Sequence, residues 1–156
     1  MNIRKASISD LNRMLEIYSI AREYMKVKGN ASQWGDSYPN ESIIKKDIEN
    51  KISYVLEEDG QVFACFAFIK GYERNYEIEF ASDLEYGIIH RVASDGSKNG
   101  IVRQIISFVK KEIDILRIDT HEDNKTMQKA VEKLGFNRLG IICLDDGSQR
   151  ILYELK

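Results

Sequence analysis

The strongest constraint on the fold is a strand, a loop, a helix and a second strand that follow one another between residues 86 and 120. Tyr86–Ala93 is an apolar run with strand character, and Ser94–Gly100 is a polar loop that holds two glycines. Apolar residues then recur at helical spacing over Ile101–Ile113, and Ile115–Thr120 has strand character again. A helix that joins two strands of one sheet makes a right-handed crossover, so we expect these strands to be parallel.

Similar patterns on both sides of this segment predict an α/β (α+β) fold with the order β-α-α-β-β-β-α-β-α-β-β. Glu58-Asp59-Gly60 is a hairpin turn signal, and Gly135 suits the residue that follows a helix. The other expected strands are Ile3–Ala6, Ser53–Glu57, Gln61–Ile69, Arg138–Leu144 and Gln149–Leu155, and the other expected helices begin near Ser7 or Ser9, Asn40 and Asn124. Leu11, Leu15, Tyr18, Ala21 and Met25 are expected to form the apolar face of the first helix.

Length and charge favour a single cytoplasmic domain over residues 1–156. The chain has 156 residues, 43% of them apolar, and a net charge of −2 with acidic and basic residues interspersed. This pattern predicts neither a nucleic-acid partner nor a membrane anchor, and Val62–Ile69 is shorter than the roughly 20 residues of a membrane span. Cys65 and Cys143 lie in apolar runs without metal-ligand spacing, so we expect buried thiols in a reducing compartment and no metal site.

The Ser94–Gly100 loop has two interpretations. The first turn of a helix presents unsatisfied N–H groups and a partial positive charge, and glycine lets a phosphate approach the backbone. The same residues are also typical of an ordinary strand-to-helix turn. The spacing of Gly96 and Gly100 matches neither a Walker loop nor a dinucleotide-binding fingerprint.

The sequence resembles the GNAT superfamily of acyl-CoA-dependent N-acetyltransferases over nearly the whole chain, and four stretches carry the resemblance. The last of them is the most specific, because an Asn at a helix start is followed by Leu-Gly-Phe. The stretches are Ile3–Ala6 with Asp10-Leu11, His90–Ser94, Ser97–Val102, and Arg117–Asn124 with Lys133–Phe136.

The resemblance implies a mixed sheet that splays between its fourth and fifth strands and that binds acetyl-CoA in the opening. It implies that pantetheine pairs with Val92–Ser94 and that the pyrophosphate binds the N–H groups of residues 98–102. It also implies that the Asn124 side chain faces the pantetheine near the thioester; the residue also fits a plain helix N-cap, and both roles can hold. The implied cofactor residues are Val92, Ala93, Ser94, Lys98, Asn99, Gly100, Ile101, Val102 and Asn124. The implied activity is acetyl transfer to a primary amine by direct attack on the thioester.

Three positions depart from the family pattern. Ser97 replaces the usual Arg or Gln of the pyrophosphate loop, and Val102 is bulkier than the usual Gly or Ala. Val131 stands where many relatives carry the Tyr that protonates the leaving thiolate. These departures keep open a catalytically silent acyl-CoA-binding domain, and also a scaffold that keeps only the fold.

An attacking ammonium must first lose a proton, so a base or a water chain is needed near the thioester. His90, His121 and Glu79 are the candidate bases, although each also fits a structural role in or beside a strand. Glu77 and Glu79 alternate on what we expect to be a strand.

The acceptor is expected to be a small amine, an amino acid or a peptide. Trp34 and Tyr38, in an irregular loop, either line its pocket or pin that loop to the core, and Glu77 is a further candidate for substrate binding. Tyr72, Tyr76 and Tyr86 are additional candidates for the wall of the acceptor pocket. Homodimers are common in the family, so the resemblance also admits a homodimer.

Overall fold

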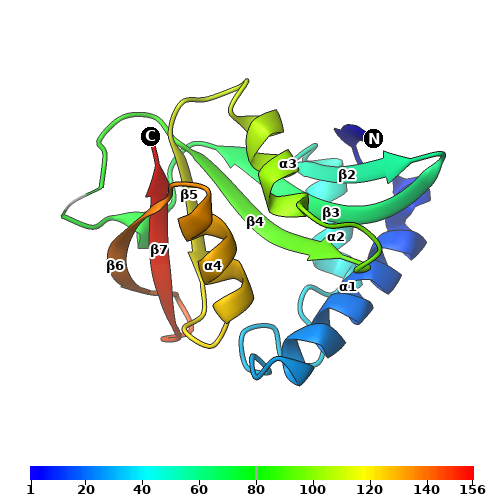
Figure 1. Ribbon diagram of the computed structural model, residues 1–156, viewed down its shortest axis with the longest axis horizontal. Helices are drawn as coiled ribbons and strands as arrows, with labels where there is room; N and C mark the ends of the chain where they lie inside the picture. Colours follow the sequence, from blue (N-terminus) through cyan, green and yellow to red (C-terminus); the bar gives the residue numbers. More distant parts are fainter. Residues whose placement is uncertain (80) are drawn as a thin grey trace. The chain divides into compact units, whose positions relative to one another are not determined.

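The order of strands and helices in the structure is the predicted one. A computed structural model describes residues 1–79 and 81–156 (Figure 1). The strands are β1 (Asn2–Lys5), β2 (Ser53–Glu58), β3 (Gln61–Lys70), β4 (Gly87–Ser94), β5 (Leu116–Thr120), β6 (Asn137–Cys143) and β7 (Gln149–Leu155). The helices are α1 (Leu11–Val27), α2 (Glu41–Glu49), α3 (Ile101–Val109) and α4 (Lys125–Lys133), with the 3-10 turns η1 (Ile8–Asp10) and η2 (Arg74–Tyr76).

The strands form one seven-stranded mixed sheet in the order β1-β2-β3-β4-β5-β7-β6. β4 and β5 are parallel, which confirms the predicted crossover through α3. Their ladder pairs Gly87 with Leu116 and Ile88 with Arg117, so it involves only the first two residues of each strand. The β1–β2, β2–β3, β5–β7 and β6–β7 pairs are antiparallel.

The chain divides into two compact units. Unit 1 comprises Met1–Phe68 and His90–Ile101, and unit 2 comprises Ile69–Ile89 and Val102–Lys156. Each unit has its own cluster of buried apolar side chains. The expectation of a single domain over residues 1–156 stays a prediction.

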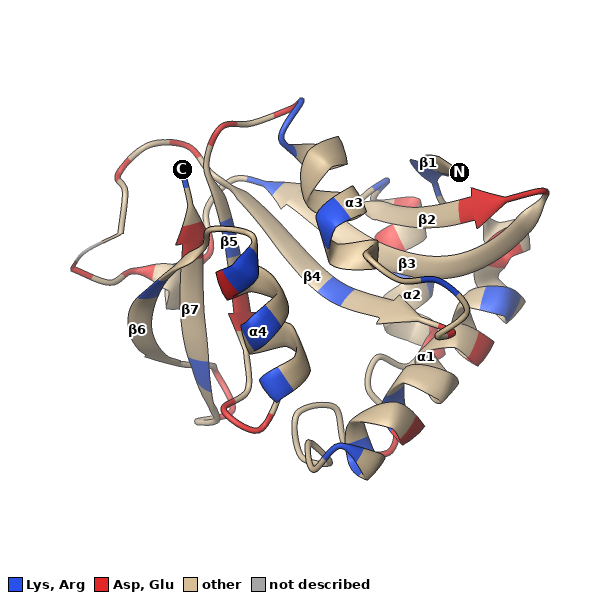
Figure 2. Cartoon of the chain, in the orientation of Figure 1, with Lys and Arg blue, Asp and Glu red and all other residues tan. Residues whose placement is uncertain are grey.

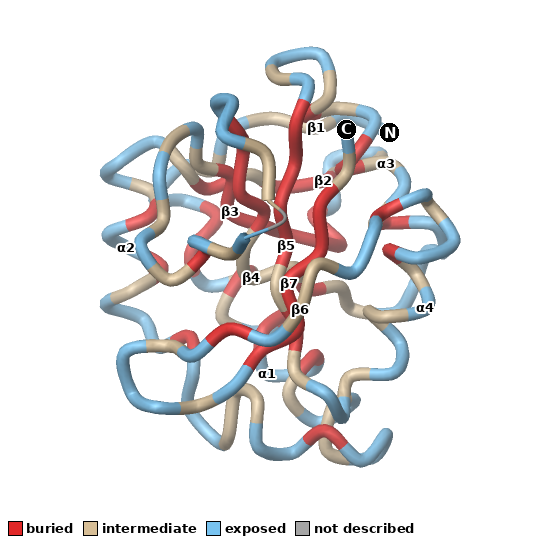
Figure 3. Tube along the Cα trace, turned by 90° about the vertical axis from the view of Figure 1, so that its left-hand side faces the viewer, coloured by how far each residue is buried: buried red, intermediate tan, exposed pale blue. Residues whose placement is uncertain are grey.

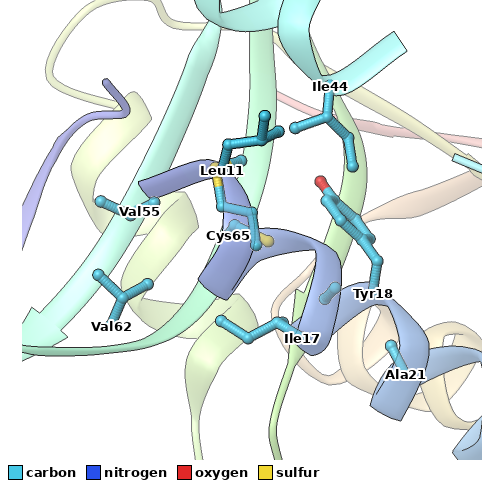
Figure 4. Packing of buried hydrophobic residues seen from close by; sticks show 10 residues of the cluster. Leu11, Ile17, Tyr18, Ala21, Ile44, Val55, Val62 and Cys65 are labelled. Carbon is cyan, nitrogen blue, oxygen red and sulfur yellow. The ribbon is translucent and has the colours of Figure 1, made fainter. Parts of the chain in front are cut away.

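The core of unit 1 lies between α1, α2 and the strands β2 and β3 (Figure 4). The buried positions of α1 recur every three or four residues, so one helix face carries the contact. This face is turned slightly from the predicted one: Met14 and Ile17 are fully buried, whereas Leu15 and Met25 are only half-buried. Burial also raises the pKa of the Cys65 thiol to about 12, so this cysteine is an inert core residue, as predicted.

The start of α1 is held by Asp10. Its carboxylate accepts a hydrogen bond of 2.8 Å from the Ser7 backbone N–H and two of 2.8 and 3.0 Å from the Arg4 guanidinium. The hydrogen bonds from Arg4 are the main reason that the pKa of Asp10 lies below its ordinary value. This contact ties β1 to the first turn of the helical segment.

We expect Asp10→Asn to destabilise the protein at neutral pH by about 1–2 kcal/mol, because it weakens a cap and a partly solvent-screened ion pair. The melting temperature should fall by roughly 2–8 °C in thermal denaturation followed by circular dichroism. Since the folded-state pKa is lowered, the contribution of Asp10 is complete above its ordinary value of 3.8 and disappears as the pH falls through the lowered value. The difference between wild type and variant should therefore shrink in acid, and a pH-independent difference would contradict this assignment.

In unit 2, β5 and β7 are largely buried (Figure 3), and α4 covers one face of them. Tyr153 of β7, the cross-strand partner of Ile118, donates a hydrogen bond of 2.9 Å to Glu132 of α4. Arg117 and Asp119 alternate with Ile118 on β5, so they point to the opposite face. That second face is covered by residues 71–79 and 81–86, between β3 and β4, as the contacts of Tyr76 and Ser82 show.

Three sequence predictions need correction. Glu77 and Glu79 are not on a strand: they follow η2 in an irregular segment, where the Glu73 side chain accepts from the Asn75 N–H and favours a turn. Cys143 is exposed, because Ile142 takes the buried face of β6 and the next residue points outward. The helix expected to continue to Ile113 ends at Val109, where bonds from Lys111 to Phe108 and from Glu112 to Val109 tighten the chain into turns.

Within the described residues, no helix is long and apolar enough to cross a membrane. The same residues contain no group of three or more His, Cys, Asp or Glu side chains placed to hold a metal ion.

Candidate functional site

The β4 segment of unit 1 contains an unusual backbone conformation at Arg91. Its φ is +52°, in the left-handed region that non-glycine residues rarely adopt inside a strand. The surroundings hold it there: Tyr18 donates a hydrogen bond of 3.0 Å to the Arg91 carbonyl, and the guanidinium contacts Asp47 at 2.8 Å and the Tyr38 hydroxyl at 3.1 Å. Strained residues of this kind cluster at binding and catalytic sites. The next residue, Val92, begins the segment that the family resemblance assigns to the cofactor.

The loop after β4 leaves several backbone donors without acceptors. The Gly96 N–H bonds the Ser94 hydroxyl at 3.0 Å, and the Ser97 N–H bonds the Asp95 carboxylate at 2.9 Å. Across the described residues, no acceptor in the chain serves the N–H groups at positions 98–100. Gly96 and Gly100 have φ values of +81° and +72°, and an added Cβ at either would meet no atom within 4 Å. Free donors and open space beside the first turn of α3 are what an anion requires.

Side chains fix the shape of this loop. Arg13 of α1 contacts the Asp95 carboxylate at 2.5 Å and the Val62 carbonyl at 2.9 Å. The Lys98 ammonium is paired with Glu58, so its side chain is engaged within unit 1. The anion-binding capacity of the loop therefore lies in its backbone.

Asn124 caps α4, as predicted: its side chain accepts a hydrogen bond of 3.1 Å from the Met127 N–H. Its second expected role, a contact with pantetheine, stays a prediction. Val131, at the position of the general acid in many relatives, is fully buried.

Trp34 and Tyr38 pack on other side chains of unit 1, to which they belong. The ring centroid of Trp34 lies 5.8 Å from that of Tyr18 and 6.2 Å from that of Tyr38, in edge-on arrangements. The Tyr38 hydroxyl also binds Arg91. Of the two interpretations of this loop, these contacts fit a loop pinned to the core by its aromatic side chains; its contact with a substrate stays a prediction.

The two histidines belong to different units. His90 lies half-buried in the part of β4 that belongs to unit 1. His121 follows β5 in unit 2, and its Nδ1 accepts a hydrogen bond of 3.0 Å from the Asp123 N–H.

Unit 2 contains a pocket of about 510 Å³, within the usual size of small-molecule sites. It brings together Glu77 and Glu79, although neither lies on the expected strand, and all three tyrosines that the sequence suggested as walls. Its lining residues are Tyr72, Tyr76, Glu77, Ile78, Glu79, Ala81, Ser82, Asp83, Tyr86 and Arg117. Figure 2 shows acidic stretches, in red, along the segment from β3 to β4 that forms most of this wall.

Arg117 supports one side of the pocket. Its Nε donates to Glu154 at 2.9 Å, its Nη2 donates to the Ser82 carbonyl at 2.5 Å, and its guanidinium lies 3.8 Å from the ring centroid of Tyr86. The Arg117 and Glu154 side chains are each only 3% exposed, so the two charges neutralise each other inside the unit. Arg117 therefore has a structural role, and its charge is not available to a ligand in the pocket.

A buried carboxylate behind the pocket was missed by the sequence analysis. Tyr76 is one of the lining residues of the pocket, and its hydroxyl donates a hydrogen bond to Asp119 of β5. Burial raises the pKa of Asp119, against the opposing effects of Tyr76 and of Arg150, whose Nε lies 3.9 Å away. A signal was present: Asp119 is the one acid within an apolar strand, where an unneeded charge is costly.

Comparison with solved structures identifies the fold. An acetyltransferase of the GNAT family from Streptococcus agalactiae matches with a TM-score of 0.87 and 29% identity, over 99% of this chain and 94% of that one. A ribosomal-protein-alanine N-acetyltransferase from Brucella melitensis matches with a TM-score of 0.67 and 17% identity, over 99% and 98% of the two chains.

A third match is yncA of Salmonella typhimurium, an acetyltransferase solved with its cofactor acetyl-CoA. Its TM-score is 0.62 and its identity 15%, over 99% of this chain and 92% of that one. No protein-family model matches the sequence, and no curated protein matches it. The resemblance seen in the sequence is therefore confirmed by structure: the chain has the GNAT fold.

Proposed function

We propose that this member of the GNAT superfamily transfers an acetyl group from acetyl-CoA to a primary amine. The observation that carries the proposal is the structural match, at 29% identity and over 99% of the chain, with an acetyltransferase of the GNAT family. The yncA protein, which shares the fold, has acetyl-CoA as its cofactor. In this chain, the free backbone N–H groups at positions 98–100 of unit 1 are suited to bind the same cofactor.

In this proposal the pyrophosphate of acetyl-CoA binds the free N–H groups of Lys98, Asn99 and Gly100 and the first turn of α3 at Ile101 and Val102. These donors belong to the backbone. The replacement of the usual Arg or Gln by Ser97 therefore removes one side-chain contact and leaves the backbone N–H groups that bind the pyrophosphate. Val92–Ser94 pairs with pantetheine, and the strained backbone of Arg91 sets the direction of that segment.

The acceptor is an ammonium in water and must lose a proton before its nitrogen can attack the thioester carbonyl. Tyr76 and Asp119 supply a route for that proton. The ammonium gives a proton to the Tyr76 oxygen while the hydroxyl proton of Tyr76 passes to Asp119, so Tyr76 stays neutral and the carboxylate becomes a carboxylic acid. A raised pKa makes Asp119 a better proton acceptor than an ordinary aspartate.

The neutral amine then forms the new C–N bond and the C–S bond breaks; the proton that the nitrogen loses passes to the departing thiolate, so coenzyme A leaves as the thiol. Of the bases expected from the sequence, Glu79 lies on the same pocket as Tyr76 and is the alternative acceptor of the proton. His121 and His90 are further alternatives. The Brucella melitensis neighbour is named for a ribosomal protein's alanine, so a peptide amine belongs among the acceptors to be tested.

The test is release of coenzyme A thiol from acetyl-CoA in the presence of a panel of small amines, amino acids and peptides, with mass spectrometry of the acceptor. We expect thiol release that depends on the acceptor and an acceptor heavier by one acetyl group. Tight binding of acetyl-CoA without transfer to any amine would instead support a silent acyl-CoA-binding domain.

A further inference from the structure

We propose that the pocket of unit 2 selects a linear aliphatic amine with two or more ammonium groups over a free amino acid. This inference rests on the proposed function, because such an amine would be the acetyl acceptor. It follows from the charge balance of the pocket wall, from its aromatic surfaces and from its size.

The pocket wall carries an excess of negative charge. Glu77, Glu79 and Asp83 contribute three carboxylates, and Arg117 is the single cation among the described residues of the wall. The charge of Arg117 is already neutralised by Glu154, which lies behind it. A ligand therefore meets three carboxylates and no available guanidinium, which favours cations and disfavours anions.

Two of these carboxylates meet no competing cation in the part of the chain that the structure describes. Within the described chain, no ion pair joins Glu79 or Asp83 to another residue. Glu77 accepts a hydrogen bond of 2.6 Å from the Tyr72 hydroxyl, which holds this carboxylate at the wall and does not neutralise it. Tyr72 thus positions an acid, and its mostly exposed ring offers a face on which an ammonium can rest.

The acids lie on a segment that is fixed to the sheet beneath it. Glu154 accepts a hydrogen bond of 3.1 Å from the Ser82 N–H, and the Tyr86 hydroxyl accepts one of 2.8 Å from the Glu73 N–H. A Cβ at Gly140 would lie 2.7 Å from Ile78, so the glycine lets the segment pack directly on β6. The negative wall is therefore built into unit 2.

Charge and size together define the ligand class. A volume of about 510 Å³ exceeds what one ammonium group needs, and several separate carboxylates can each bind one ammonium of an extended chain. An α-amino acid brings a carboxylate into the same wall, with no free cation to receive it, so repulsion and desolvation oppose its binding.

A matched pair of ligands tests this class: 1,4-diaminobutane and ornithine have the same two amines, and only ornithine has a carboxylate. Calorimetry with and without coenzyme A should show the diamine binding at least about fivefold tighter, with an affinity that falls as salt is raised. Equal or tighter binding of ornithine would overturn the inference. A peptide whose N-terminal amine binds better than the diamine would overturn it in favour of a peptide acceptor.

Charge-neutral variants locate the binding site. We expect Glu79→Gln and Asp83→Asn each to weaken diamine binding by about two- to fivefold, and the double variant by roughly tenfold. Glu49→Gln, which removes an exposed carboxylate from α2 in unit 1, is the control and should change nothing. If the diamine binds and the double variant binds it equally well, this pocket is not the site.

The failure of this inference is distinguishable from that of the proposed function. If the diamine does not bind and acetyl-CoA still does, this inference fails and acetyl transfer to another amine stands. If acetyl-CoA itself does not bind, the proposed function fails, whatever the pocket does.

Discussion

Gly100→Glu is expected to weaken acetyl-CoA binding by roughly ten- to hundredfold. A carboxylate about 4–5 Å from a phosphate charge costs on the order of 3 kcal/mol at the effective dielectric of a protein surface, and less where solvent screens it. The new side chain has room, because an added Cβ meets no atom within 4 Å, so the loss comes from charge and blockage of the donors at positions 98–100. Calorimetric titration with acetyl-CoA measures the effect.

Two controls separate this effect from backbone strain. Gly100 has a φ of +72°, so any side chain there is strained, and Gly100→Ala imposes that strain without a charge. Gly147→Glu adds the same charge at a φ of +82°, also with open space around it, in the turn between β6 and β7. Both controls should bind acetyl-CoA much better than Gly100→Glu does. Unchanged affinity in a folded Gly100→Glu protein would exclude this loop as the pyrophosphate site.

Asp119→Asn is expected to lower kcat by about 10² to 10⁴, the usual contribution of a general base. The amide keeps the shape of the side chain and an oxygen that can accept from Tyr76, and it cannot take up a proton at neutral pH. Acetyl-CoA affinity should stay within about twofold of wild type, because the change affects proton transfer and not the phosphate site. Tyr76→Phe, which removes the hydroxyl that donates to Asp119, should reduce kcat in the same direction.

The pH profile checks this assignment independently. Asp119 accepts a proton only when ionised, so wild-type kcat should fall as the pH drops through its pKa, which burial places above the ordinary value for aspartate. This acid limb should disappear from the residual activity of Asp119→Asn. If Asp119→Asn keeps full activity and Glu79→Gln or His121→Gln loses it, the base is the one expected from the sequence.

The sequence predicts local structure well wherever one short segment contains the whole signal. Strand, glycine loop and helix succeed one another between residues 86 and 109 as expected, Asn124 caps its helix, and Gly135 adopts a φ of +92° after α4. Each of these depends on periodicity, on a cap or on a turn within a few residues. The GNAT resemblance in these same stretches agrees with the structure.

The features that escaped prediction join residues far apart in the chain. Tyr76 and Asp119 are 43 positions apart, and no spacing rule indicates their hydrogen bond. Alternating Glu77 and Glu79 suggested a strand, whereas contacts with Tyr72 and with the sheet fold that segment into a pocket wall. Arg91 looked like an ordinary strand residue, and its positive φ depends on partners at positions 18, 38 and 47.

The most direct test of the central claim is calorimetric titration of the wild-type protein with acetyl-CoA. The account predicts saturable binding to one site per chain, which is weakened by Gly100→Glu and preserved in Gly147→Glu. Absence of binding by a protein shown to be folded by circular dichroism would contradict it, because the chain would then have the fold without its cofactor.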